Sequence, residues 1–192
     1  MQLSSSNLTV GRRLTLAFGA VVFILIAVTS VTWFTSSRLA EADRWDTHTH
    51  KVLGRGAGML ENMLNMETGA RGFIVSGKDT FLEPWNAGRT TFDRYWDETK
   101  RLTADNPVQQ KRLDDMKARR TEFEAVVTAM FQMRRDVTAG KVPMAAMTEE
   151  FSKGKDKAAM DGFRALHEQF DKMERDLLVQ RSATAESMRA AN

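Results

Sequence analysis

The sequence contains no cysteine and only three prolines in 192 residues. Without cysteine the chain has no disulfide, no thiolate metal site and no cysteine nucleophile. So few prolines leave long stretches free to form helices, because proline removes a backbone donor and clashes inside a helix. The charged fraction, 28%, is ordinary and argues against global disorder. The length suits one domain, or one domain with a tail.

One run of 21 residues, 14–34, carries no charge. As a helix rising 1.5 Å per residue it would span about 31 Å, close to the thickness of a bilayer core. Arg12 and Arg13 precede the run, which predicts a cytoplasmic N-terminus. We therefore predict a cytoplasmic stub at 1–13, a transmembrane helix at 14–34 and an extracytoplasmic domain at 35–192. A cleaved signal peptide is the alternative, but its apolar region would be shorter.

The acidic and basic residues are unevenly divided by this run. All 25 acidic residues and 26 of the 28 basic ones follow Phe34, so the predicted exported part has a net charge of only +1. The overall charge of +3 mostly reflects Arg12 and Arg13 and reports membrane orientation. Because no basic excess remains on the domain, we expect no nucleic-acid partner.

The region after residue 35 shows helical periodicity and no convincing strand. We predict four helices, over about 36–75, 80–103, 107–139 and 147 to the C-terminus. Long helices with short connections favour an all-α, antiparallel up-down-up-down four-helix bundle. The first helix has an inward seam at steps of four and three residues: Trp45, Thr49, Val52, Gly56, Met59, Met63, Met66, Ala70 and Phe73.

Glu67 and Arg71 are the most informative polar pair. They are four residues apart, with the acid first, which is the favourable order on a helix. They also continue a second seam through Leu60 and Leu64, so both are expected to point inward. The pair then either fixes the register of the bundle or responds to a ligand or a helix shift.

Other candidate chemistry is weak. The methionines at 59, 63 and 66 share a helix face, which is more typical of core packing than of Cu(I) binding. His48 and His50 face different ways, and His167 lacks the Glu-x-x-His spacing of di-iron bundles. We expect no metal, no cofactor and no enzymatic activity. The glycines at 54, 56 and 58 indicate either close packing or a soft helix segment.

The segment 67–85 resembles the signature of the third class of CHASE sensory domains. The pattern is Glu-x-Gly-x-Arg-Gly-aromatic-x-aliphatic-Ser/Thr-Gly, and every position is met here. The resemblance implies an extracytoplasmic four-helix sensor of a bacterial receptor, in the inner membrane, and a homodimer. It assigns structural or signalling roles to Glu67, Gly69, Arg71, Gly72, Phe73 and Gly77.

The N-terminal segment 8–14 is similar to that of methyl-accepting chemotaxis proteins. Receptors of this kind continue into a second membrane span and a signalling module, so we expect the chain to be the sensing end of a longer protein. The predicted function is ligand sensing for a chemoreceptor-like receptor. The alternatives are the sensor region of a histidine kinase or cyclase-type receptor, and a membrane-anchored interaction protein without signalling output.

The expected ligand is an unidentified small molecule or protein. Its binding residues are not marked by any motif. Arg89, Arg94 and Arg120 are suitable for an acidic ligand, but solvated helix faces explain them equally well.

Overall fold

The computed structural model describes residues 9–190, and all the regular secondary structure in that range is helical. The all-α prediction is therefore confirmed. The elements are α1 (Val10–Ser76), the 3₁₀ helix η1 (Asp79–Leu82), α2 (Glu83–Leu102), α3 (Pro107–Thr138), α4 (Met144–Ser152) and α5 (Lys155–Ala190). The chain divides into two units, residues 1–45 with 181–192, and residues 46–180. The second unit lies inside the predicted domain 35–192.

In the first unit, α1 presents apolar side chains on every side. The large residues of the run 14–34 are exposed around the whole helix, and no part of this segment is buried. Its hydroxyl groups bond back to the helix: Thr29 Oγ1 donates to Leu25 O over 2.8 Å and Ser30 Oγ to Ile26 O over 2.7 Å. By length and composition α1 is able to cross a membrane.

The helix does not stop where the apolar run stops. We expected separate helices before and after residue 35, but α1 is assigned without a break from Val10 to Ser76. The reason is local: residues 35–53, which follow the apolar run, contain neither glycine nor proline and so nothing that would end a helix. Ser37 Oγ donates to Phe34 O over 2.9 Å and so stays within the helical pattern.

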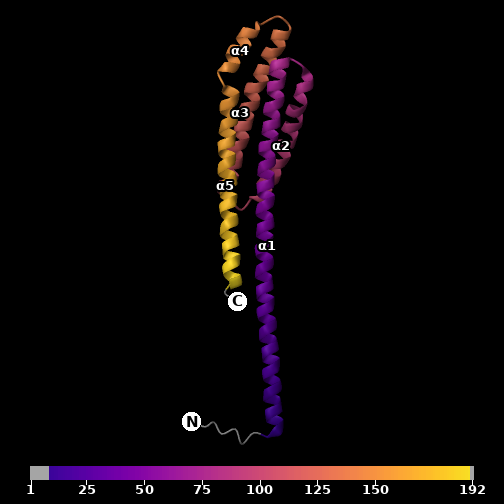
Figure 1. Ribbon diagram of the computed structural model, residues 1–192, viewed down its shortest axis with the longest axis vertical. Coiled ribbons are helices and arrows are strands. Elements are labelled where there is room, and N and C mark those ends of the chain that lie inside the picture. The colour runs from indigo at the N-terminus through magenta and orange to yellow at the C-terminus, as the bar shows by residue number, and fades with distance from the viewer. Residues whose placement is uncertain (1–8, 191–192) are drawn as a thin grey trace. The chain divides into compact units, whose positions relative to one another are not determined.

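In the second unit, α1, α2, α3 and α5 run alternately up and down and enclose one core (Figure 1). The predicted inward seam of α1 is buried from Thr49 to Phe73, but the prediction is wrong for its first member, Trp45, which is 36% exposed. The other helices contribute mainly aromatic and methionine side chains. The core comprises Trp85, Phe92, Leu113, Met116, Phe123, Val127, Met130, Phe131, Met147, Ala159, Met160, Phe163 and Phe170 besides the α1 residues. Phe81 of η1 lies outside this core and remains 45% exposed.

The turns follow from the sequence. Gly77 has φ +70° and donates to Phe73 O over 2.7 Å, which closes the end of α1. Asn106 caps α3 by accepting from Gln109 N over 3.1 Å, and Pro107 occupies the first helical position. Both features agree with the predicted boundaries.

The fourth predicted helix is interrupted, which corrects the sequence prediction. Gly154 adopts φ +63° and separates α4 from α5. Glu150, near the end of α4, accepts from Lys153 over 2.5 Å and from Lys155 over 2.7 Å, and these bonds lower the pKa of its carboxyl to about 2. The prediction joined the apolar positions on either side of residues 152–157, a run that contains no apolar side chain.

Candidate functional site

At Gly69 the backbone of α1 lies directly against the backbones of η1 and α2. A Cβ atom placed on Gly69 would lie 2.8 Å from Trp85 N and 2.9 Å from Phe81 O. Both neighbours are backbone atoms, which cannot rotate away. Gly69 is therefore required because its neighbours leave no room for a side chain, and not because of its backbone conformation.

The two other glycines of this segment accommodate side chains. A Cβ on Gly72 would lie 2.6 Å from Cδ1 of Phe81, so the half-exposed Phe81 ring rests on the α1 backbone. At Gly77 a Cβ would lie 2.5 Å from Nη2 of Arg134, and the positive φ independently favours glycine. Of these two glycines, Gly72 lies in the last turns of α1 and Gly77 in the turn between α1 and η1.

Phe73 connects this segment to the core. Its ring packs edge to face on Phe131 of α3, with 5.0 Å between ring centroids. Phe131 packs in the same way on Trp85 of α2, at 5.1 Å. Phe73 is thus part of an aromatic cluster that joins three helices.

Glu67 accepts from two arginines. Its Oε1 lies 2.8 Å from Arg71 Nη2, and its Oε2 accepts from Arg164 Nη2 of α5, also over 2.8 Å. Arg164 in turn contacts Asp161 at 3.1 Å, and Arg71 lies 3.9 Å from the buried Asp156. The pair predicted from the sequence is confirmed as an ion pair, and the structure extends it into a network between α1 and α5.

Only one member of the predicted pair points inward. The side chain of Glu67 is 9% exposed, as expected, but that of Arg71 is 48% exposed. The long arginine stem lets the guanidinium reach Glu67 from the edge of the bundle. Sequence reasoning missed Arg164 because it lies 97 residues from Glu67, and no local spacing signals that contact.

Arg120 is buried rather than solvated, which corrects the interpretation that all three arginines line a solvated face. Its Nη1 donates to Asp93 over 2.8 Å, and its Nη2 lies 3.0 Å from Glu124. Arg89 is exposed and pairs with the same Glu124 at 3.0 Å. Arg94 is exposed and lies 5.1 Å from the centroid of the neighbouring tyrosine ring. The charge of Arg120, the most buried of the three arginines, is therefore already neutralised by Asp93 and Glu124.

A second buried polar cluster joins α3 to α5 near the other end of the bundle. Gln109 is fully buried, and its Nε2 donates to Phe170 O over 3.1 Å and to Glu174 Oε1 over 2.7 Å. Arg112 Nη1 donates to Gln109 Oε1 over 2.5 Å. Nothing in the sequence pattern had indicated this cluster.

The glycines at 54, 56 and 58 divide into two kinds. A Cβ on Gly56 would lie 2.9 Å from Cε1 of Phe170, and one on Gly58 would lie 2.9 Å from Cε2 of Tyr95, so both serve close packing. Gly54 has nothing within 4 Å. The methionines at 59, 63 and 66 are fully buried core residues, and the described residues contain no group of three potential metal ligands among their His, Asp and Glu side chains.

His167 lies half-buried between α5 and α1. Its Nε2 atom is buried without a hydrogen-bond partner in the described structure, and its ring stacks on Phe163 at 6.5 Å. Burial lowers the pKa of His167 below the ordinary 6.5, opposed by the backbone of Gly56 and the carboxylate of Asp171.

Acidification is therefore expected to destabilise the bundle through His167. The unfolded state takes up a proton near pH 6.5 while the folded state still resists it, so the free energy of unfolding falls as the pH drops below about 6.5. Thermal unfolding of the detergent-purified chain between about pH 7.5 and 5.5 measures this slope. His167→Gln should flatten it, whereas the exposed His50→Gln should not. Equal slopes in all three proteins would contradict the assignment.

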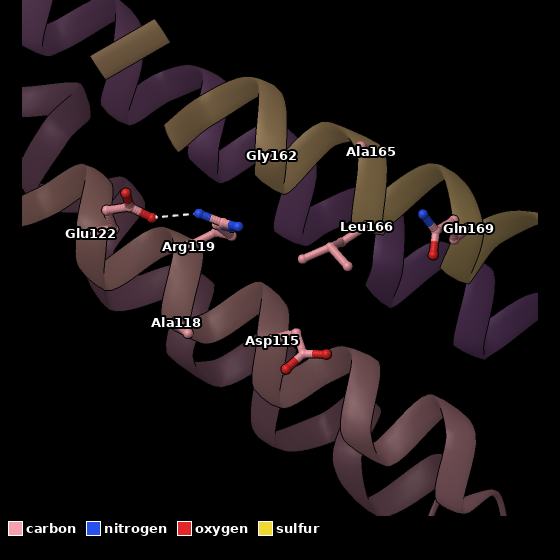
Figure 2. Close-up of a pocket in the computed structure, with 8 residues that line it drawn as sticks. All are labelled: Asp115, Ala118, Arg119, Glu122, Gly162, Ala165, Leu166 and Gln169. Carbon is pink, nitrogen blue, oxygen red and sulfur yellow. Dashed lines mark hydrogen bonds and ion pairs between the residues drawn. The ribbon is translucent and has the colours of Figure 1, made fainter. Parts of the chain in front are cut away.

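A groove of about 470 Å³ lies between α3 and α5 (Figure 2). Its lining residues are Asp115, Ala118, Arg119, Glu122, Gly162, Ala165, Leu166 and Gln169. A second hollow of about 400 Å³ shares Gln169 and continues toward Gln180. Both hollows are open to solvent along the surface of the bundle.

The family of the chain follows from comparison with family models. Residues 42–184 match the model of the CHASE3 domain, which is about three quarters of the chain. The chain belongs to the CHASE3 domain family. The resemblance found in the 67–85 segment is thereby confirmed, and the general role that it supports is sensory.

One solved structure has the same fold as the CHASE3 domain. It is the crystal structure of the sensor domain of the histidine kinase HK9 from Rhodopseudomonas palustris, with 20% sequence identity and a TM-score of 0.57. The similarity covers 68% of this chain and 98% of the HK9 domain. No curated protein matches the sequence.

Proposed function

We propose that the chain is the ligand-sensing input region of a transmembrane signalling receptor in the bacterial inner membrane. One observation supports this proposal above the others. The single helix α1 contains an apolar segment of membrane-spanning length and also continues into the CHASE3 bundle as one of its long helices. Ligand binding would favour one of two bundle arrangements. Displacements of about 1–2 Å in α1 or α5 are sufficient for such signalling.

The proposed orientation places the N-terminus in the cytoplasm and the bundle outside it. Arg12 and Arg13 flank the apolar segment on its N-terminal side, and short basic segments are retained in the cytoplasm. Alkaline phosphatase, which is active only after export, should be active when fused after residue 190. Activity of a cytoplasmic reporter at the same position would contradict this orientation.

We propose chemotaxis as the output, on the likeness of segment 8–14 to chemotaxis receptors. The shared fold with HK9 favours a histidine kinase as the second candidate. Fusing the chain to the output module of each receptor class and measuring tumbling or kinase activity separates the two. A response from only the kinase fusion would reject the chemoreceptor reading.

We further propose a homodimer formed through α1. Beside the buried seam, α1 carries Leu53, Ala57, Leu60 and Leu64 at steps of four, three and four residues. These side chains are only partly covered, and Leu64 is 40% exposed. Such a continuous apolar stripe on a helix surface is typical of a helix–helix interface.

Cysteine crosslinking in membranes tests the dimer directly, because the chain has no cysteine of its own. Leu64→Cys should form a disulfide-linked dimer. Asn65→Cys is the matched control, since it is exposed and turned by about 100° around the same helix. Equal crosslinking at both positions, or none at Leu64→Cys, would reject the α1 interface.

A further inference from the structure

The groove between α3 and α5 exists because the facing positions carry small side chains. Ala118 on α3 and Gly162 and Ala165 on α5 line the groove, and Leu166 extends into the space between the helices (Figure 2). Side chains larger than alanine at these positions would fill the groove, whereas its open side allows a small molecule to enter from solvent.

Arg119 occupies a defined place at one end of this groove. A Cβ on Gly162 would lie 3.2 Å from both Cδ and Nε of Arg119, so the arginine stem rests on the glycine backbone. Its Nη1 donates to Glu122 over 2.8 Å. A guanidinium has five N–H donors, and the bond to Glu122 leaves the others available to a second carboxylate.

Asp115 supplies the opposite charge. It precedes Arg119 by four residues on α3, which places the two side chains on one helix face with about 5–6 Å between their Cβ atoms. Asp115 is paired with Lys111, and Arg119 with Glu122, but both pairs are solvent-exposed. Exposed pairs contribute about 0–1 kcal/mol and are readily exchanged for a ligand's charges.

We propose that this groove binds a small zwitterion with an apolar side chain. This inference rests on the proposed sensory function and names its ligand class. The ligand's carboxylate binds Arg119, its ammonium group binds Asp115, and its apolar part covers Leu166. A simple anion would be repelled by the carboxylates of Asp115 and Glu122, and an uncharged molecule would form no ion pair with either Arg119 or Asp115.

Three probes with the same apolar part separate the two charges: leucine, isopentylamine, which lacks the carboxylate, and 4-methylpentanoate, which lacks the amine. Calorimetric titration of the detergent-purified full chain should show leucine binding at least about tenfold more tightly than either analogue. No leucine binding up to about 10 mM, or equal affinity for all three probes, would overturn the proposal.

Two variants assign each charge to its residue. Arg119→Gln should weaken leucine binding about tenfold and leave isopentylamine binding unchanged, and Asp115→Asn should weaken isopentylamine and leucine binding alike. Arg101→Gln, an exposed arginine of α2 outside the groove, is the control and should change neither. If Arg119→Gln behaves like this control, the groove is not the site.

Failure of this proposal is distinguishable from failure of the proposed sensory function. Export of the bundle and crosslinking at Leu64→Cys are measured without any ligand. If both are observed while leucine does not bind, the ligand class is wrong and the receptor assignment stands.

Discussion

Gly69→Ala is expected to lower the free energy of unfolding of the bundle by about 2–3 kcal/mol. The added methyl group would meet Trp85 N and Phe81 O at less than 3 Å, so α1 and the start of α2 must separate. That separation also loosens the contact between Trp85 and Phe131. For a chain of this size the melting temperature should fall by about 5–10 °C, measured by near-ultraviolet circular dichroism in detergent.

Gly54→Ala is the matched control for this prediction. It lies on the same helix and in the same unit, and nothing is within 4 Å of its Cβ position. There alanine should stabilise the helix by up to about 1 kcal/mol, because glycine is the poorer helix former. If the free energy of unfolding falls in Gly69→Ala and rises in Gly54→Ala, the backbone contact at Gly69 is the cause of the loss. A loss of similar size at both positions would refute it.

Removing both arginines from the Glu67 network should cost more than removing the carboxylate. In Glu67→Gln the guanidinium groups remain hydrated, since Arg71 and Arg164 are 48% and 41% exposed, and Arg164 keeps its contact with Asp161. We expect a loss of about 1–2 kcal/mol. The double variant Arg71→Met with Arg164→Met leaves a buried carboxylate without a cation, which should cost about 3–5 kcal/mol.

The triple variant, which combines these three substitutions, should recover part of the stability lost in the double variant. It no longer contains the unpaired carboxylate of Glu67, so that part of the penalty is removed, while the buried Asp156 still lacks Arg71. Lys172→Met is the control, because its pair with Asp176 is exposed on both sides and should contribute less than about 0.5 kcal/mol. Thermal unfolding gives all four values. A larger loss of unfolding free energy in Glu67→Gln than in the double variant would contradict this prediction.

Periodicity predicted the core of α1 accurately because burial of a helix face depends on local spacing. The seam from Thr49 to Phe73 is buried as expected, and the turn at Gly77 and the cap at Asn106 lie at the predicted positions. The break at Gly154 was missed because the apolar positions on either side of it were joined across residues 152–157. That polar run, with a glycine between two lysines, was the signal of the break.

Contacts between distant segments were not predictable in this way. Arg164 reaches Glu67 from 97 residues away, and Gln109 reaches Glu174 from 65. Arginine is usually a surface residue, but Arg120 is buried between two carboxylates that belong to different helices. Each of these depends on how the helices are paired and rotated, which single-helix patterns do not encode.

Residue order and spacing were sufficient to predict the helical class, the apolar segment of spanning length, the inward seam of α1 from Thr49 onward and the family. Three features became visible only in the folded bundle: why Gly69 must be glycine, which arginines bind Glu67, and where a groove remains open between α3 and α5. Those features arise where side chains from separate helices meet, and their positions are fixed only when the bundle is packed.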